Sequence, residues 1–335
     1  MQKLNINRKM SLGKNTPFIM DKHKKHIEIS LGMACNNKCI FCMNTGPRNF
    51  VPFEQVIAEA REYSEKGYNS VGFIGGDPTI YKRIVELGRQ IRDMGFKHIH
   101  LITNGRRLRN IEFLDELIDA GFNRFSVSIH SLRPEVEDEL TGVRGGWEHK
   151  IEGIENLVKR CNEGAFSDRV ALNTVMNKMN VADLDTMVRF FSDIGITDMR
   201  LLIIRPEGRA LENFHRLVPR LTEIREKLPA VIHTARRHNV NVMMDPPPFC
   251  LFYDIPGFNM ILASDYIDDV VADAVRQERA SFSWNEFRVR NKVKKESCAE
   301  CCFDARCEGV WRGYVQEYGF EEFRAVTRED LSKIY

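Results

Sequence analysis

Short apolar segments alternate with amphipathic segments along the first 240 residues, and this alternation restricts the fold more than any other feature of the chain. The apolar segments are typical of strands and lie at residues 26–31, 69–74, 98–103, 123–129, 169–175 and 199–204. The amphipathic segments have helical periodicity and lie at residues 53–66, 81–94, 111–120, 149–162, 181–194 and 219–238. Strands that alternate with helices form a parallel sheet covered by helices. The sequence therefore predicts an α/β fold, a partial (βα)6 barrel of the TIM type, with a small cysteine-rich C-terminal extension.

Three cysteines follow the first predicted strand with the spacing CxxxCxxC: Cys35, Cys39 and Cys42. Thiolates are soft ligands that suit iron–sulfur clusters, and a 4Fe–4S cluster requires four ligands. A loop that supplies only three thiolates leaves one iron open to a small molecule. Zinc is the alternative, but zinc modules usually combine CxxC pairs or Cys/His motifs, and no histidine lies in this loop.

A glycine-rich turn follows the second predicted strand and reads Gly75, Gly76, Asp77, Pro78, Thr79. Because glycine has no Cβ, backbone N–H and C=O groups in such a turn can approach a ligand closely, and Pro78 stiffens its exit. Taken alone, the motif is an ordinary turn. Its place one βα unit after the cysteine loop makes it a candidate for binding an amino group.

Together the two motifs resemble those of the radical S-adenosylmethionine (radical SAM) superfamily, whose cysteine loop has an aromatic residue before the last cysteine, here Phe41. The glycine motif of that family usually reads GGEP, and this chain has Asp77 where glutamate is commoner. The resemblance implies that S-adenosylmethionine (AdoMet) binds the open iron through its amino and carboxylate groups. It also implies that an electron from the reduced cluster cleaves AdoMet to methionine and a 5'-deoxyadenosyl radical, which abstracts hydrogen from a substrate.

Polar residues at the ends of other strands are further candidates for the AdoMet site, because functional groups of parallel α/β barrels lie on the loops after the strands. The candidates are Asn104, Ser128 and Asn173. The resemblance implies that a polar residue ending the fourth strand contacts the AdoMet ribose, which assigns that role to Ser128, with Asn173 beside it. An ordinary turn at Asn104 and a buried, hydrogen-bonded core serine are the structural alternatives.

His130 and Arg205 follow the fourth and sixth predicted strands. A histidine titrates near neutral pH, so His130 is a candidate proton carrier. The planar guanidinium of Arg205 is suited to a carboxylate or phosphate. A structural role is the alternative for each of them.

The remaining cysteines concentrate after residue 240, and their pattern resembles the auxiliary-cluster extensions, of SPASM and twitch type, found in many radical SAM enzymes. The resemblance predicts a four-thiolate site for a second 4Fe–4S cluster, formed by Cys250, Cys298, Cys301 and Cys307. Cys302 is then the spare thiol, because side chains of adjacent residues diverge and the CxxC spacing favours Cys301. Zinc bound by the same four thiolates is the alternative.

The chain is thereby divided into three predicted parts: a polar N-terminal arm at residues 1–25, the radical SAM partial barrel at 26–240 and the auxiliary-cluster extension at 241–335. Aromatic residues also concentrate in the third part, and we expect them to cap the barrel and shield a radical from solvent, although each ring can equally pack as ordinary core. These residues are Phe252, Tyr253, Phe258, Phe282, Trp284, Phe287, Trp311 and Tyr318.

The composition excludes several classes of protein. The formal net charge is +2, so the chain lacks the strongly basic balance of a nucleic-acid-binding protein. No apolar run is long enough to span a membrane. Nine cysteines, three of them in the spaced loop, fit metal ligation in a reducing compartment better than a disulfide framework, so we expect a cytoplasmic location.

The sequence therefore predicts an enzyme that cleaves AdoMet reductively and abstracts hydrogen from a peptide or small metabolite, in peptide maturation or in natural-product or cofactor biosynthesis. The predicted cofactors are AdoMet, its 4Fe–4S cluster and a second 4Fe–4S cluster. The predicted partners are the substrate and an electron donor such as flavodoxin or ferredoxin. One alternative is an iron–sulfur electron-transfer or scaffold protein, which has no need of the glycine turn. Another is RNA modification, which the net charge disfavours.

Overall fold

The computed structural model describes residues 25–166, 170–262, 273–275 and 281–333, with the backbone alone described at 273–275 and 281–286. Residues 1–24 of the predicted N-terminal arm therefore lie outside the described residues. The side chains of Phe282 and Trp284, two of the expected capping rings, lie outside them as well.

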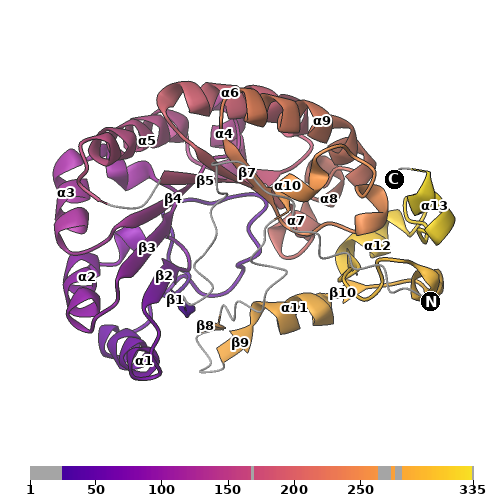
Figure 1. Ribbon diagram of the computed structural model, residues 1–335. Helices are drawn as coiled ribbons and strands as arrows, with labels where there is room; N and C mark the ends of the chain where they lie inside the picture. The colour runs from indigo at the N-terminus through magenta and orange to yellow at the C-terminus, as the bar shows by residue number, and fades with distance from the viewer. Residues whose placement is uncertain (1–24, 167–169, 263–272, 276–280, 334–335) are drawn as a thin grey trace.

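One curved sheet of nine strands organises the molecule, in the order β7-β6-β5-β4-β3-β2-β1-β8-β9. Seven strands are successive parallel neighbours: β1 (His26–Ser30), β2 (Ser70–Ile74), β3 (His98–Thr103), β4 (Arg124–Ser128), β5 (Val170–Met176), β6 (Asp198–Ile203) and β7 (Asn241–Met244). β8 (Asp273–Val275) pairs parallel with β1, and β9 (Ser281–Ser283) pairs antiparallel with β8. Figure 1 shows the sheet bent into an arc with the helices along its outer side. The α/β class and the helix-covered parallel sheet are confirmed.

All six predicted strands are present, and β7 adds a seventh parallel strand that the alternation did not reveal. β7 has only four residues and leads into three prolines, so it lacks the length of the other apolar segments. It pairs with β6 from Asp198↔Asn241 to Leu201↔Met244. The sheet therefore continues past residue 240.

The predicted helices are also present, several with shorter ends: α1 (Phe53–Glu65), α2 (Ile84–Asp93), α3 (Ile111–Asp119), α5 (Gly146–Asn162), α6 (Leu184–Ile194) and α9 (Leu221–Arg237). Within residues 26–240, the described helices also include three that were not predicted: α4 (Pro134–Thr141), α7 (Arg209–Glu212) and α8 (Phe214–Leu217). Short 3-10 helices lie at Pro78–Ile80, Arg106–Arg109, Val181–Asp183, Phe249–Leu251 and Glu296–Glu300. α4 was missed because it has eight residues and begins at a proline, which is favoured in the first turn of a helix.

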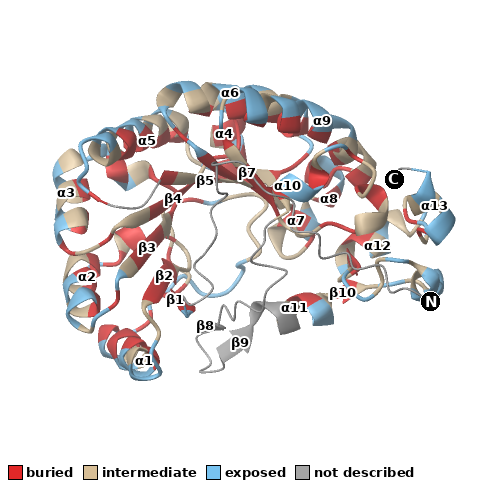
Figure 2. Ribbon diagram, in the orientation of Figure 1, coloured by how far each residue is buried: buried red, intermediate tan, exposed pale blue. Residues whose placement is uncertain are grey.

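Side chains alternate between the two faces of the strands, and the helix-facing side forms the core. Ile27 and Ile29 of β1 and Phe125 and Val127 of β4 are completely buried. Figure 2 shows this burial continuing along the sheet and the inner sides of the helices. Burying a side chain of this size stabilises the fold by about 1.5–3 kcal/mol. The core therefore fixes the strand ends from which the loops of the site emerge.

The C-terminal region packs beside the ends of the last strands. Its elements are α10 (Phe258–Ile261), α11 (Trp284–Asn291), β10 (Lys292–Val293), β11 (Val310–Trp311), α12 (Arg312–Tyr318) and α13 (Arg328–Ser332). The hydroxyl of Tyr314 accepts a hydrogen bond from Leu221 N at 2.9 Å, and the hydroxyl of Tyr318 donates to Val218 O at 2.9 Å. These bonds join α12 to the start of α9. In the part of the chain that the structure describes, no helix is both long and apolar enough to cross a membrane.

Candidate functional site

The cysteine loop lies after β1 and is held by backbone hydrogen bonds to two other loops. Lys38 N donates to Thr141 O at 2.8 Å and Ile40 N donates to Leu140 O at 3.0 Å, both in the last turn of α4. At the other side of the loop, Arg209 N donates to Cys42 O at 3.1 Å. The loop is therefore fixed between the β4–α5 and β6–α7 connections.

The three thiols of this loop influence one another electrostatically. Burial raises the pKa of Cys39 to about 12; nearby Lys150 opposes this rise, whereas Cys42 and Cys35 add to it. Burial also raises the pKa of Cys35, whose sulfur accepts a hydrogen bond from Asn37 N at 3.3 Å. Without a metal the thiols of Cys35 and Cys39 stay protonated, and a bound metal would displace their protons. Three partly buried thiols on one loop, one of them with an N–H donor to its sulfur, fit a cluster-binding loop.

Among the described residues, no three His, Cys, Asp or Glu side chains converge as a site for a single metal ion requires. The pKa influences among the three thiols nevertheless place them in one neighbourhood. Ligation by Cys35, Cys39 and Cys42 stays a prediction.

The glycines of the turn after β2 bring that turn against the cysteine loop. Gly76 N donates to Gly32 O at 2.7 Å, and Asp77 N donates to Ala34 O at 2.8 Å. A Cβ on Gly75 or Gly76 would collide with the carbonyl oxygen of Gly32 or Ala34, and Gly75 has a φ of 138°. The immediate need for glycine here is thus close packing of two backbones, which differs from the ligand approach expected from the sequence. Binding of AdoMet by Gly75, Gly76, Pro78 and Thr79 stays a prediction.

The carboxylate of Asp77 is almost completely buried and is used inside the protein. Its Oδ1 accepts from Thr79 N at 2.9 Å and from Thr103 Oγ1 at 3.0 Å. Its Oδ2 accepts from Thr103 Oγ1 at 2.9 Å and from Asn104 N at 2.8 Å. Asp77 therefore ties the end of β2 to the end of β3. A contact of Asp77 with AdoMet stays a prediction.

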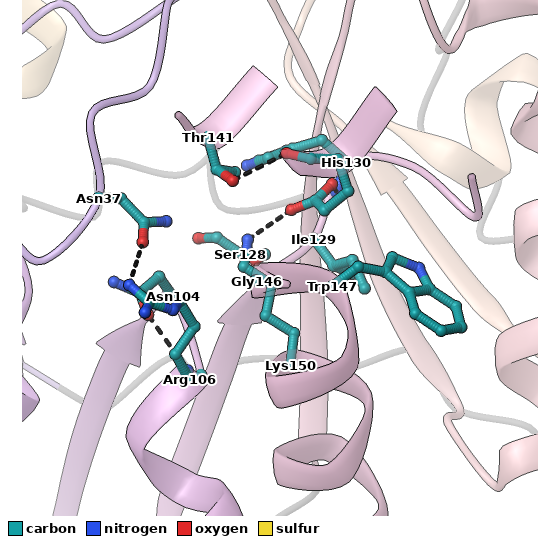
Figure 3. A network of polar contacts seen from close by, with 12 residues as sticks. Asn37, Asn104, Arg106, Ser128, Ile129, His130, Thr141, Gly146, Trp147 and Lys150 are labelled. Atoms are coloured by element: carbon teal, nitrogen blue, oxygen red, sulfur yellow. Dashed lines mark hydrogen bonds and ion pairs between the residues drawn. The ribbon is translucent and has the colours of Figure 1, made fainter. Parts of the chain in front are cut away.

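Asn104 connects the end of β3 to the cysteine loop. Its Nδ2 donates to Asn36 Oδ1 at 2.6 Å and lies 4.0 Å from Cys35 Sγ. Arg106 Nη1 donates to Asn36 O at 2.9 Å and to Asn37 Oδ1 at 3.1 Å. Figure 3 shows Asn37, Asn104 and Arg106 together. The sequence analysis missed Arg106, because nothing in its local sequence indicates a contact seventy residues away.

Arg48 closes the loop from its other end. Its Nη1 donates to Cys35 O at 3.2 Å and to Asn37 O at 3.1 Å. Arg48 was also missed by the sequence analysis. Two guanidinium groups, those of Arg48 and Arg106, therefore lie against the backbone around Cys35. The positive charge of Arg48 acts against the rise in the pKa of the Cys35 thiol.

Ser128 and Asn173 lie side by side, because they are register partners on β4 and β5. Both are half-buried. The backbone carbonyl of Ser128 accepts a hydrogen bond from Lys150 Nζ at 2.8 Å. The structure thus brings the two candidates together at the end of adjacent strands, and ribose contact by them stays a prediction.

Phe41 packs edge-to-face on His130, with 4.8 Å between ring centroids. His130 Nδ1 accepts from Val175 N at 3.1 Å, and burial lowers the pKa of His130 to about 4. A ring that is neutral at physiological pH and fixed by a backbone donor favours the structural role of His130 over proton transfer.

The four cysteines predicted for an auxiliary cluster also lie near one another. Burial raises the pKa of Cys250 to about 11, and Cys307, Cys301 and Cys298 raise it further. Gly309 N donates to Cys307 Sγ at 3.4 Å, and Val326 N donates to Cys301 Sγ at 3.3 Å. Sulfur atoms that accept backbone N–H groups suit thiolate ligands. Ligation of a cluster or of zinc by these four stays a prediction.

Cys302 differs from its neighbour Cys301. It is exposed, and its backbone N donates to Val326 O at 2.9 Å. Cys302 is also absent from the groups that raise the pKa of Cys250. These observations are consistent with Cys302 as the spare thiol.

Arg205 links the cysteine loop to the C-terminal extension. Its Nη1 lies 3.6 Å from Met43 Sδ, and its Cζ lies 5.3 Å from the ring centroid of Trp311 and 5.9 Å from that of Phe287. A small, mostly apolar pocket borders Trp311 and is lined among others by Ile204, Leu221, Pro247, Lys292, Val310 and Tyr314. Phe287 and Trp311 of the extension thus lie near Arg205, which contacts Met43 beside the cysteine loop.

Residues 29–191 match the family model described as the radical SAM superfamily. Three relatives carry the name "Probable GTP 3',8-cyclase". Those of Sulfurisphaera tokodaii, Thermococcus kodakarensis and Metallosphaera sedula are 30%, 34% and 31% identical over 58%, 61% and 62% of this chain. The chain covers 62%, 65% and 69% of these relatives, so it spans about two thirds of their length or less.

Two solved structures resemble the fold over most of the chain. Streptococcus suis SuiB bound to S-adenosylmethionine has a TM-score of 0.62 at 17% identity, over 90% of this chain and 76% of that one. The anSMEcpe structure with bound AdoMet and Kp18Cys peptide has a TM-score of 0.61 at 13% identity, over 88% of this chain and 96% of that one. At these identities the likeness concerns the fold alone. From its match to the family model and its identity to the Metallosphaera relative, the chain belongs to the radical SAM superfamily.

Proposed function

We propose that this chain cleaves AdoMet reductively and uses the resulting 5'-deoxyadenosyl radical to abstract hydrogen from a peptide or small metabolite. Members of the radical SAM superfamily use a 4Fe–4S cluster together with AdoMet. The observation that carries the proposal is the close approach of the cysteine loop and the glycine turn, through the bonds from Gly76 N and Asp77 N to Gly32 O and Ala34 O. An electron carrier alone has no need of that second loop.

The chain's own residues hold and orient the reactants. When bound at Cys35, Cys39 and Cys42, the cluster supplies an open iron site and the electron for cleavage. The turn from Gly75 to Thr79 positions the amino group of AdoMet. Asp77 fixes this turn through its hydrogen bonds to Thr79 and to the end of β3. Asn104 and Phe41 border the loop.

The ribose lies, in this proposal, beside Ser128 and Asn173, which are half-buried neighbours at the ends of β4 and β5. Aromatic residues of the extension keep water from the reacting carbon. Phe287 and Trp311 lie near Arg205, whose sulfur contact with Met43 brings them close to the cysteine loop.

In this proposal the extension binds an auxiliary 4Fe–4S cluster through Cys250, Cys298, Cys301 and Cys307. An auxiliary cluster in turn favours an oxidative outcome for the substrate. SuiB has also been solved with a precursor peptide, and anSMEcpe with peptides, which supports a peptide as the substrate. The proposed electron donor is an acidic protein such as flavodoxin or ferredoxin. The proposed location is the cytoplasm, where thiols stay reduced.

A nucleotide is the second candidate substrate. The curated relatives, about 30% identical to this chain, are named as cyclases of GTP. Mixing the reconstituted enzyme with GTP discriminates between the candidates, because a nucleotide substrate would accelerate 5'-deoxyadenosine formation and a peptide enzyme would not respond.

The division into a barrel at residues 26–240 and an extension at 241–335 is proposed as a functional division. The sheet itself crosses it, because β7 pairs with β6. The cysteines of the second group, in contrast, all lie beyond it.

The test is anaerobic reconstitution with iron and sulfide, followed by dithionite and AdoMet. Formation of 5'-deoxyadenosine, measured by mass spectrometry, supports the proposal, and a Cys39→Ala variant is expected to form none. A cluster that never yields 5'-deoxyadenosine supports an electron carrier instead.

The Cys35→Ala/Cys39→Ala/Cys42→Ala variant is expected to keep about four irons, those of the auxiliary cluster. Zero remaining iron removes the auxiliary cluster from the proposal, and zinc found instead would assign the second site to zinc.

A further inference from the structure

The chain leaves the sheet after Ser128, the last residue of β4, and turns toward α4. We call residues 128–130 the β4 exit. Ile129 is completely buried and His130 is 3% exposed, so the backbone groups of the exit are largely shielded from water. Buried backbone N–H and C=O groups need hydrogen-bond partners, and beyond a strand end the sheet no longer supplies all of them. The partners of the exit therefore decide how firmly Ser128 is held.

Two opposite charges bind the two ends of the β4 exit. Lys150 Nζ of α5 donates to Ser128 O at 2.8 Å, and Glu137 Oε2 of α4 accepts from His130 N at 2.8 Å. The two side chains also form an ion pair with each other, and both are 0% exposed. Figure 3 shows Lys150 extending from α5 toward Ser128. Two helices thus hold the exit through one buried pair.

β5 and the loop after it bind the rest of the β4 exit. Ile129 N donates to Asn173 O at 3.1 Å, and the hydroxyl of Thr174 donates to Ile129 O at 2.8 Å. Asn180 Nδ2 donates to His130 O at 2.8 Å. The five backbone groups of the exit, from its first carbonyl to its last, thus all have partners, and four of these partners are side chains that are 0% exposed.

The buried pair supplies geometry that apolar residues could not supply. Replacing a buried ion pair by apolar groups of similar size often leaves stability unchanged or improves it, so stability alone is a weak reason for Lys150 and Glu137. Apolar side chains at these positions would leave Ser128 O and His130 N without their partners. The end of β4 could then shift relative to Asn173, the register partner of Ser128 on β5.

We propose that Lys150 and Glu137 are positioning residues, which fix the β4 exit and thereby hold Ser128 beside Asn173 for contact with the ribose of AdoMet. Because both side chains are fully buried, they act through the backbone of the exit and do not touch AdoMet themselves. This inference rests on the proposed function, because it requires Ser128 to contact the ribose.

The test is the binding of AdoMet to the reconstituted protein, measured by anaerobic equilibrium dialysis and expressed per loaded cluster. Lys150→Met/Glu137→Gln replaces both charges by neutral side chains of similar shape. It leaves an amide oxygen to accept from His130 N, but it provides no donor to Ser128 O. The double variant is expected to raise the Kd for AdoMet about tenfold.

The matched control is an ion pair on the same helix. Arg160, near the C-terminal end of α5, pairs with Asp115 of α3. Arg160→Met/Asp115→Asn is expected to leave the Kd for AdoMet unchanged.

A positioning role and a merely structural role change different quantities. A structural loss lowers the amount of folded, loaded protein, and it leaves the Kd of the loaded fraction and the KM for AdoMet unchanged. A loss of positioning raises both the Kd and the KM at equal iron per chain. A loaded double variant that binds AdoMet as tightly as wild type overturns the inference.

If the double variant fails to fold or to take up iron, Thr174→Val decides. It keeps the shape of a fully buried side chain and removes only the hydroxyl that donates to Ile129 O. Its Kd for AdoMet is expected to rise about threefold, because the same segment loses one of its bonds. An unchanged Kd in this variant overturns the inference. A wild-type chain that takes up the cluster but does not bind AdoMet overturns the proposed function instead.

Discussion

At the scale of single residues, Asp77 joins two loops whose connection the sequence did not indicate. Its carboxylate accepts from Thr79, Thr103 and Asn104, and the group is 2% exposed. A glutamate at this position would carry the carboxylate one methylene further from the backbone. The shorter side chain of this family member is thus matched to the threonine at the end of β3.

Asp77→Ala is expected to lower the free energy of unfolding by about 2–4 kcal/mol, because it leaves several buried donors without an acceptor. Urea unfolding of the cluster-free protein measures this loss. Asp93→Asn, at a side chain that is 70% exposed, is the control and should change stability little. A loss below about 1 kcal/mol for Asp77→Ala would mean that the donors find other partners.

The buried histidines make stability depend on pH. The pKa of His130 is about 4 in the folded protein, and burial also lowers the pKa of His100 well below its ordinary value. An unfolded histidine takes up a proton near pH 6.5, so between pH 6.5 and 4 the unfolded state binds more protons and stability falls as pH falls.

For His130 this loss amounts to about 3 kcal/mol over that interval. Carboxylates with lowered pKa contribute in the same direction, so the comparison is between wild type and His130→Asn, which keeps an acceptor for Val175 N. Denaturant unfolding at pH 7 and pH 5 is expected to show a smaller pH dependence in the variant. Equal slopes in the two proteins would contradict the neutral state of His130.

At the scale of elements, the cysteine loop is positioned by the glycine turn as well as by the hydrogen bonds of its own residues. A residue with a side chain does not fit at position 76, because its Cβ would collide with the backbone of Ala34, directly before Cys35. The packing of these two loops, which belong to different βα units, therefore requires the glycine turn, just as the binding of a ligand there would.

Gly76→Ala is expected to displace the cysteine loop and to reduce iron uptake at the first site severalfold. Iron per chain after reconstitution measures this, best in a background in which Cys298, Cys301 and Cys307 are alanine. Gly46→Ala is the matched control, since Gly46 lies in the same loop with no atom near the added Cβ. Full iron uptake by Gly76→Ala would show that the loop can adjust.

The elements themselves were largely predictable, and the contacts between them were not. Alternating apolar and amphipathic segments identified six strands and their helices, because periodicity is a local property. α4 and β7 escaped because each is short. The contacts of Arg48 and Arg106 were not predicted, because the sequence does not indicate which distant residues meet.

At the scale of the whole molecule, the barrel and the extension are joined by a polar junction at the start of α9. The Tyr314 hydroxyl accepts from Leu221 N and donates to Glu322, which also accepts from Thr222 N at 2.9 Å and Thr222 Oγ1 at 2.6 Å. Burial raises the pKa of Tyr314, so its hydroxyl stays protonated and keeps donating. The junction places the second cysteine group at a fixed position relative to the first.

Tyr314→Phe removes one hydroxyl and leaves the N–H of Leu221 and one oxygen of Glu322 without that partner. We expect a loss of about 1–3 kcal/mol in the free energy of unfolding, because both groups are shielded from water. If the junction holds the extension in place, limited proteolysis should also cut beyond residue 244 sooner in the variant than in wild type, while the barrel persists. Tyr68→Phe, at the loop after α1, is the control for removing a tyrosine hydroxyl elsewhere. Faster cleavage throughout the barrel would instead mean that the two parts unfold together. The extension would then belong to the same cooperative unit as the sheet, whose strand β7 lies beyond residue 240.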